Sequence, residues 1–179
     1  INYFIKKYED KIFTHPAGVA IHHDYSSGLL MHITSMAELA LFLAEHYEAD
    51  KDLLITGCLL HDIGKLIELE GKFTFKYSTE GKLLGHISIM VSELKQASKE
   101  LNITSEVPLL LEHMVLSHHD KPEYGSPIPP CTKEALLLSM IDNMDSKMCI
   151  VDKALENVEP GNFSSKVFPL DGRCLYKRK

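Results

Sequence analysis

No stretch of this sequence is long and apolar enough to suggest a membrane span. The longest candidate, residues 53–60, is short and contains Thr56 and Gly57, whereas roughly 18 apolar residues are needed to cross a bilayer. The N-terminal residues are polar and amphipathic and lack the pattern of a secretory signal. We therefore expect a soluble protein without a membrane partner.

Paired cysteines and an excess of positive charge are also missing. The four cysteines are scattered, with no CxxC spacing. Free thiols in a reducing cytosol are the simplest interpretation, so we expect a cytoplasmic location. The formal net charge is −6, which argues against this chain alone holding a nucleic-acid backbone by electrostatics.

The size and composition of the chain are those of one globular domain. It has 179 residues, of which 45% are hydrophobic and 25% are charged. It contains neither an internal repeat nor a low-complexity tract. The chain starts at Ile1 rather than at Met, so we expect it to be a fragment that lacks its N-terminal part.

Apolar residues recur at helical spacing along most of the chain, which predicts an all-α fold for residues 1–179. Gly64 is placed to end one helix, and Thr132 is placed to cap another. Residues 66–77 are expected to be irregular, with a short extended piece at 73–76. The expected helices span residues 2–13, 26–47, 50–64, 80–101 (capped by Ser78 or Thr79), 108–118 and 132–156, followed by an extended tail at 161–179 that folds back on them.

Histidine is the one residue in excess, with ten in the chain, and several interrupt apolar helix faces. His61 and Asp62 stand side by side at the end of an apolar run. Burying an unpaired carboxylate beside an imidazole is costly, and a divalent metal is the usual compensation. Polar donors on apolar faces are typical of metal ligands that converge in a helical bundle. Four further predicted helices carry the other inward-facing candidates, which are His32, His86, His118, His119 and Asp142.

The donor chemistry favours transition metals. Imidazoles and carboxylates without a thiolate suit Mn, Fe, Co, Ni or Zn rather than Ca. Two ions that share the carboxylate of Asp62 would use all the donors and would generate a bridging hydroxide for phosphoester hydrolysis. Neighbours differ by about 100° on a helix, so either one of His118 and His119 does not bind directly or the helix has already ended. A hydrogen-bonded core residue is the alternative for each histidine taken alone.

The ligand pattern resembles a known superfamily. The order His32, His61-Asp62 and Asp142 resembles the signature of the HD superfamily of metal-dependent phosphohydrolases, and His86 with His118-His119 resembles its two-metal branch. A closer resemblance, over essentially the whole chain, is to the YhaM-type 3′→5′ exoribonucleases. In that family an OB-fold nucleic-acid-binding domain precedes the HD domain, and we expect that domain to be missing from this fragment. The resemblance rests on residues 22–29, 80–87, 116–119, 124–127, 141–143 and 159–176.

This resemblance implies a centre with two divalent transition-metal ions, of which manganese comes first and Fe, Co, Ni or Zn are alternatives. Asp62 would bridge the ions and be the essential catalytic residue. The reaction implied is stepwise hydrolysis from the 3′ end of single-stranded RNA, with DNA left open, and it releases nucleoside 5′-monophosphates. The other ligands implied are His32, His61 and Asp142 for one ion, and His86 with His118 or His119 for the other.

Three residues are candidates for contact with a substrate. Lys65 could touch a phosphate oxygen or help the leaving group, and the alternative is a solvated lysine that suits the helix dipole. Tyr124, in the loop 120–130, could stack on a base or simply pack within the loop. His23 could orient a ligand from behind or belong to a plain loop.

Two other functions are kept open. A nucleotidase or cyclic (di)nucleotide phosphodiesterase of the HD type would use the same ligands. The loop after His118-His119 resembles the His-His-x-x-x-Gly-Tyr-Pro element of cyclic-dinucleotide phosphodiesterases, but the Gly-Tyr-Pro is not present. A catalytically silent HD module that binds nucleotides is disfavoured because every ligand position is filled. The oligomeric state, including a homo-oligomer, is left open.

Overall fold

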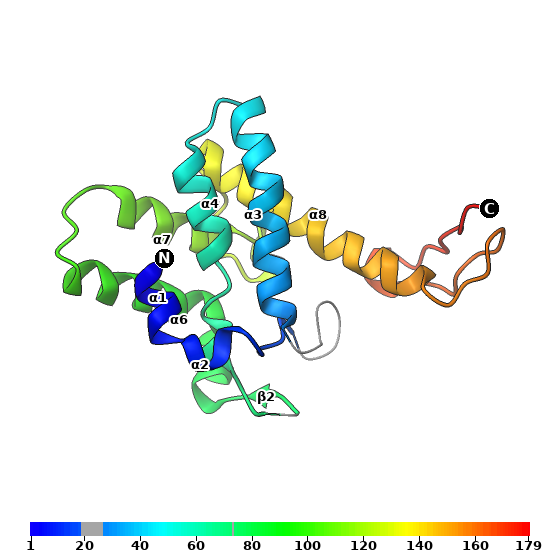
Figure 1. The fold of residues 1–179 in the computed structure, drawn as a ribbon, viewed down its shortest axis with the longest axis horizontal. Helices are drawn as coiled ribbons and strands as arrows, with labels where there is room; N and C mark the ends of the chain where they lie inside the picture. The colour runs from blue at the N-terminus through cyan, green and yellow to red at the C-terminus, as the bar shows by residue number, and fades with distance from the viewer. Residues whose placement is uncertain (19–26, 73) are drawn as a thin grey trace.

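The computed structural model describes residues 1–18, 27–72 and 74–179, and nearly all of its regular structure is helical (Figure 1). The only sheet in these ranges pairs two short antiparallel strands, β1 (Leu69–Glu70) and β2 (Lys76–Tyr77). The expected all-α fold is therefore confirmed. The helices are α1 (Asn2–Lys7), α2 (Glu9–Ile12), α3 (Gly28–His46), α4 (Lys51–Leu60), α5 (Lys65–Glu68), α6 (Thr79–Glu100), α7 (Val107–Ser117) and α8 (Lys133–Leu155), with 3-10 turns at Pro122–Tyr124 and Phe168–Leu170.

Side-chain caps fix where three of the main helices begin. The carboxylate of Asp50 accepts a hydrogen bond from the backbone N–H of Leu53 at 3.0 Å and starts α4. Ser78 and Thr132 do the same for α6 and α8. Such caps satisfy donors that the first turn of a helix leaves unpaired. The predicted starts of these helices are confirmed, and Ser78 rather than Thr79 is the cap.

The core is built around α3, which packs against α4 and α8, and it continues where α7 packs against α4 and α6. Leu29, Ile33, Met36 and Ala40 recur at helical spacing on α3 and are fully or almost fully buried. By length and composition alone α3 could cross a membrane, since its most apolar window has a mean hydropathy of 1.3, so the expectation that no segment is long enough does not hold for it. Its apolar face nevertheless packs inside the bundle.

The predicted helix at residues 2–13 is wrong in one respect, because the chain breaks at Tyr8 into α1 and α2. The side chain of Tyr8 is buried, and its hydroxyl donates to Glu93 of α6 at 2.6 Å. This contact anchors the N-terminal segment against α6.

Gly64 begins a helix rather than ending one. Its backbone is right-handed helical (φ −55°) and it caps α5, whereas α4 ends at Leu60. A Cβ at this position would overlap the backbone carbonyl of His86. Glycine is therefore required by the close approach of α6, and not by a left-handed helix end. α5 itself was not predicted, because four residues are too few to show a helical period.

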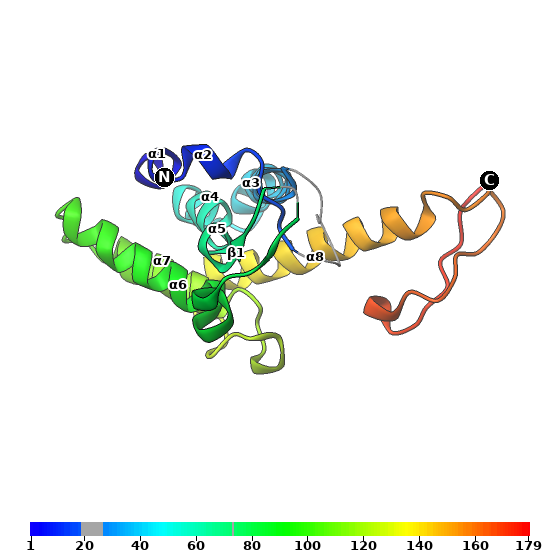
Figure 2. The same cartoon turned by 90° about the horizontal axis from the view of Figure 1, so that it is seen from below.

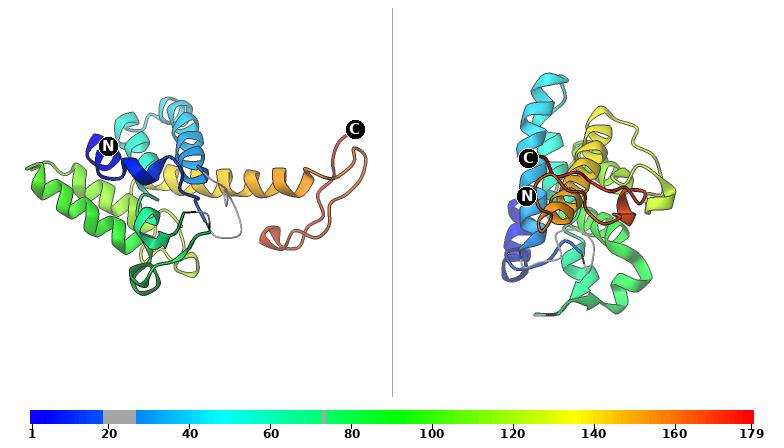
Figure 3. Two further views of the ribbon diagram at one scale, coloured as in Figure 1. Left: turned by 60° about the horizontal axis from the view of Figure 1, so that its bottom comes forward. Right: turned by 90° about the vertical axis from the view of Figure 1, so that its right-hand side faces the viewer.

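The C-terminal tail forms a hairpin of its own. Isolated bridges join Phe163 to Tyr176 and Val167 to Arg173, and Lys177 donates to the carbonyl of Leu155 at the end of α8. Figures 2 and 3 show the second half of α8 leaving the bundle, with this hairpin beside it. The expected extended tail is thus present, but it folds mainly on itself.

Gly64→Ala is expected to lower the free energy of unfolding by about 2–3 kcal/mol, because the added methyl group overlaps rigid backbone of α6. Gly57→Ala is the matched control, since its methyl group would meet the flexible end of the Met114 side chain, and alanine favours a helix by up to about 1 kcal/mol. Urea denaturation of both variants measures the difference. Equal midpoints would contradict the close-approach explanation.

Candidate metal centre

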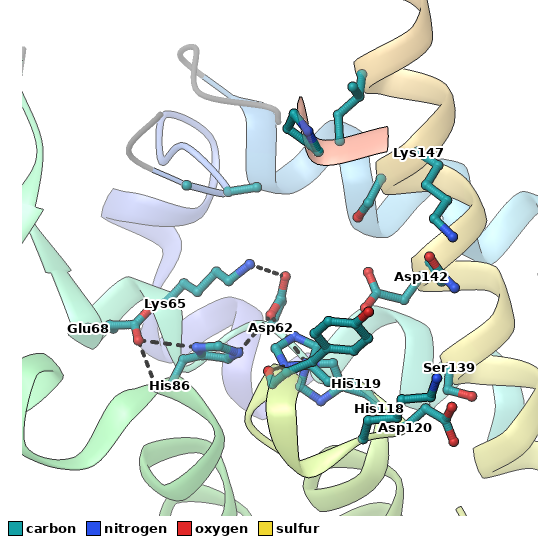
Figure 4. Close-up of a pocket in the computed structure, with 18 of the residues that line it drawn as sticks. Asp62, Lys65, Glu68, His86, His118, His119, Asp120, Ser139, Asp142 and Lys147 are labelled. Atoms are coloured by element: carbon teal, nitrogen blue, oxygen red, sulfur yellow. Dashed lines mark hydrogen bonds and ion pairs between the residues drawn. The ribbon is translucent and has the colours of Figure 1, made fainter. Parts of the chain in front are cut away.

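The described structure brings all of the predicted metal ligands into one place (Figure 4). His32 comes from α3, His61 and Asp62 from the turn after α4, and Asp142 from α8. His86 follows Gly85, where a positive φ of 70° kinks α6. His86 is therefore the first residue of the longer part of α6, which runs to Glu100. Donor atoms lie within 4.8 Å of one another in three overlapping groups, which are His32–His61–Asp62, His61–His118–Asp142 and His86–His118–His119.

Asp62 lies between the two sides of this cluster. Its Oδ2 faces Nε2 of His61 at 3.5 Å and Nε2 of His32 at 3.7 Å. Its Oδ1 faces Nε2 of His86 at 3.5 Å and Nε2 of His118 at 3.9 Å. Two ligands that bind one ion at about 2.1 Å each lie roughly 3–4 Å apart. Each oxygen of Asp62 is therefore placed to share a metal with a different pair of histidines.

The imidazole rings are held from behind by hydrogen bonds at Nδ1. Because carbonyl and carboxylate oxygens only accept, each Nδ1 carries the proton, and Nε2 is left to bind a metal. The acceptors are Asp145 for His32 (2.7 Å), the carbonyl of Cys58 for His61 (2.9 Å), Glu68 for His86 (3.1 Å), the carbonyl of Val115 for His118 (2.7 Å) and the carbonyl of Tyr124 for His119 (2.6 Å).

Several buried polar atoms in the cluster have no hydrogen-bond partner among the described residues. They are Nε2 of His61, His86 and His118 and Oδ1 of Asp62. An unsatisfied buried polar atom is costly and rare in native proteins. All of these atoms point to the same small volume, so the residues fit divalent metal ions well.

The protonation states of His61, His118 and Asp62 agree with that fit. Burial lowers the pKa of His61 and holds the pKa of His118 well below its usual range, so both rings stay neutral, as metal ligands must be. Burial opposes ionisation of Asp62, but Lys65 and the surrounding imidazoles outweigh it and keep the pKa of that carboxyl well below the usual value. Asp62, in the middle of the cluster, is thus an anion.

His32 differs from these residues in its protonation. Burial opposes protonation of the ring, but hydrogen bonds to Asp142 and Asp145 outweigh this and raise the pKa of His32 to about 9. An ion would have to displace that proton.

His118 and His119 both reach the cluster. α7 ends at Ser117, and Asp120 has a positive φ of 65°, so the chain turns sharply after the pair. The two ring centroids lie 4.1 Å apart with an interplanar angle of 61°. The backbone N–H of His119 donates to Ser126 at 2.9 Å. The sequence left two possibilities, that one of the two histidines does not bind directly or that the helix ends before them. The helix does end before them, at Ser117.

Two carboxylates with a role here were missed from the sequence. Glu68 is buried and accepts hydrogen bonds from both the backbone N–H and the Nδ1 of His86. Asp145 accepts from Nδ1 of His32 and from the hydroxyl of Ser35. Asp145 lies one helical turn after Asp142, a spacing that places both on one face and could have revealed it. No comparable spacing in the sequence points to Glu68, since it lies in α5, which is too short to show a helical period.

Two of the three candidate substrate residues, Lys65 and Tyr124, line a cavity of about 860 Å³. Lys65 lines it and is nevertheless buried, with its Nζ 2.6 Å from Oδ2 of Asp62. It is therefore not a solvated helix-end lysine. Tyr124 lines the rim and is 67% exposed, so it is not packed within the loop. His23 lies outside the described residues.

Comparison with known proteins agrees with this geometry. Residues 29–147 match the HD domain family, a range that contains every residue of the cluster. The chain belongs to the HD domain family. Membership in the HD family and the His/Asp clusters together support a site that can hold metal.

Full-length relatives are similar along almost the whole chain. The 3′-5′ exoribonuclease YhaM of a Geobacillus species is 51% identical over 98% of this chain and 54% of its own length. YhaM of Bacillus subtilis is 49% identical over 98% of this chain and 56% of its own length. The chain thus spans about half the length of these relatives.

Among solved structures, the HD domain of the phosphodiesterase PgpH from L. monocytogenes aligns with 72% of this chain and 68% of its own, at 20% identity and a TM-score of 0.41. A similarity this low adds nothing to the assignment.

Glu68→Gln and Asp145→Asn are each expected to weaken Mn²⁺ binding by about tenfold or more, because each removes a carboxylate that orients a ligand histidine. Isothermal titration calorimetry measures the affinity. Glu70→Gln is the control, since Glu70 is exposed and pairs with Lys76 at 3.4 Å. Unchanged Mn²⁺ affinity in both test variants would show that the rings need no such support.

Proposed function

We propose that this protein is a two-metal phosphodiesterase that removes nucleotides one at a time from the 3′ end of single-stranded RNA and releases nucleoside 5′-monophosphates. The observation that supports it most directly is the position of Asp62, whose two oxygens face two different sets of histidines. The names of the relatives support the substrate and direction. Because the chain spans about half of those relatives, their whole activity enters here as a proposal.

In this proposal the cluster holds two divalent ions, with Mn²⁺ as the expected metal and Fe, Co, Ni or Zn as alternatives. When bound, such ions supply positive charge to the phosphodiester and lower the pKa of water towards neutrality. Asp62 would contact both ions. The remaining ligands would be His32, His61 and Asp142 on one side and His86, His118 and His119 on the other.

The chain's own residues would position the substrate. Lys65 holds Oδ2 of Asp62 from the cavity side, where its ammonium group can also face a phosphate oxygen. Tyr124 presents an exposed ring at the rim, and stacking on aromatic rings is how single strands are held without sequence preference. The 3′-terminal base would stack there while its phosphate lies beside Asp62.

The alternative substrates, a mononucleotide or a cyclic dinucleotide, use the same ligands, but the relatives' names do not favour them. Two further expectations belong to the proposal. They are a cytoplasmic location, based on the free state of all four cysteines, and action without a membrane partner.

The substrate is tested with oligoribonucleotides labelled at the 5′ end, incubated with the protein and Mn²⁺. A ladder of products that shorten one nucleotide at a time is the expected result. Hydrolysis of a cyclic dinucleotide without any such ladder would instead support the alternative. The same oligomer in DNA measures the preference for RNA.

Asp62→Ala is expected to lower kcat by at least about 10³-fold, because it removes the one carboxylate that faces both halves of the centre. Elemental analysis of the same protein should show less than the full metal content of the wild type. Asp52→Ala is the control, since Asp52 lies exposed on the outer side of α4. Activity that survives the loss of Asp62 would refute the proposal.

A further inference from the structure

The cavity at the metal centre continues along one face of α8. The lining residues of this helix recur every three or four positions, so they form a single stripe. They run from Ser139 to Ile150, which corresponds to about 16 Å of helix at 1.5 Å per residue, and Pro169 of the C-terminal hairpin lines the cavity as well. A wall of this length extends well beyond the ligands. The stripe consists of Ser139, Asp142, Asn143, Ser146, Lys147 and Ile150.

Lys147 is the one cationic residue on this stripe. Figure 4 shows its side chain leaving α8 near Asp142, on the side of the cavity opposite Lys65. It is exposed, and none of the described residues forms a hydrogen bond or ion pair with its ammonium group. Lys65, by contrast, is buried and already pairs with Asp62.

The nearby carboxylates leave the charge of Lys147 uncompensated. Asp62 pairs with Lys65 at 2.6 Å, Asp142 faces His32 at 3.2 Å, and Glu68 faces His86 at 3.1 Å. An unpaired ammonium on the wall of a cavity attracts anions and focuses them there. The natural anion at this position is a second phosphate of the substrate.

We propose that Lys147 binds the phosphate on the 5′ side of the scissile one, and so makes the enzyme prefer chains with at least two phosphodiester bonds. This inference rests on the proposed function. Lys147 lies five residues after Asp142, which is about 7.5 Å along the helix and comparable with the distance between neighbouring phosphates in a strand. A strand whose 3′ end lies at the metal centre therefore passes Lys147 with its next phosphate.

Short substrates separate this contact from the chemistry. A dinucleotide without terminal phosphates has only the scissile phosphate, whereas a trinucleotide also has the phosphate that Lys147 would bind. The wild-type protein with Mn²⁺ should show a kcat/KM for the trinucleotide about tenfold above that for the dinucleotide, the size expected of one charge-assisted contact. In Lys147→Ala this ratio should fall towards one, because the trinucleotide loses far more kcat/KM than the dinucleotide.

Two further variants make the comparison specific. Lys147→Arg should restore most of the preference, because it keeps the positive charge. Lys153→Ala should keep the full preference, since Lys153 is on the same helix but does not line the cavity. The dependence of trinucleotide binding on salt should also weaken in Lys147→Ala, by about one unit of the log–log slope per lost phosphate contact.

The outcomes distinguish this inference from the proposed function. If the wild type cleaves both oligonucleotides but shows no preference, or if Lys147→Ala keeps the preference, Lys147 does not bind the second phosphate and the proposed function stands. If the wild type cleaves neither oligonucleotide, the proposed function fails and the role of Lys147 fails with it.

Discussion

The structure depends on how one buried carboxylate is balanced. Asp62 is almost completely buried, and an isolated charge in such a place would cost many kcal/mol. It stays ionised because an ammonium group and several imidazoles surround it. Lys65 and His61 are its neighbours in sequence, whereas His32 comes from α3 and His86 from α6. The positions of α3, of α6 and of the end of α7 relative to the turn after α4 are therefore tied to this one side chain.

Unpaired backbone carbonyls at the ends of two helices fix the orientation of two histidine rings of the cluster. The last carbonyls of a helix have no partner within it. His61 and His118 each lie just beyond the end of a helix. The Nδ1–H of each ring donates a hydrogen bond to the carbonyl three residues earlier, that of Cys58 for His61 and that of Val115 for His118. The same bond satisfies an unpaired carbonyl and fixes the ring, so a histidine directly after a helix is both stable and correctly aimed. His32 lies inside α3, and His86 begins the long segment of α6. For these two histidines the carboxylates of Asp145 and Glu68 accept from Nδ1 instead and fix the rings.

These differences explain what the sequence could predict. His32, His61 and Asp142 were visible because each interrupts an apolar helical face, and that pattern is local. The role of Gly64 is not visible in the local sequence, because a contact with α6, which is distant in sequence, requires the glycine. Glu68 could not be foreseen, since its bond to His86 requires both the short α5 and the kink at Gly85.

The long helix α8 fixes the distances between the residues that line one wall of the cavity. Its first half is buried in the core through Ala135, Leu138 and Ile141, Asp145 still contacts α3, and the second half leaves the bundle. A straight helix keeps the separation between its residues constant, so any group further along α8 lies at a set distance from the metal ligands. The loop after His119 also lines the cavity, through Asp120, Lys121 and Tyr124, and has no such regular spacing. Under the proposed function, selection of the substrate by length is therefore a property that α8 can provide.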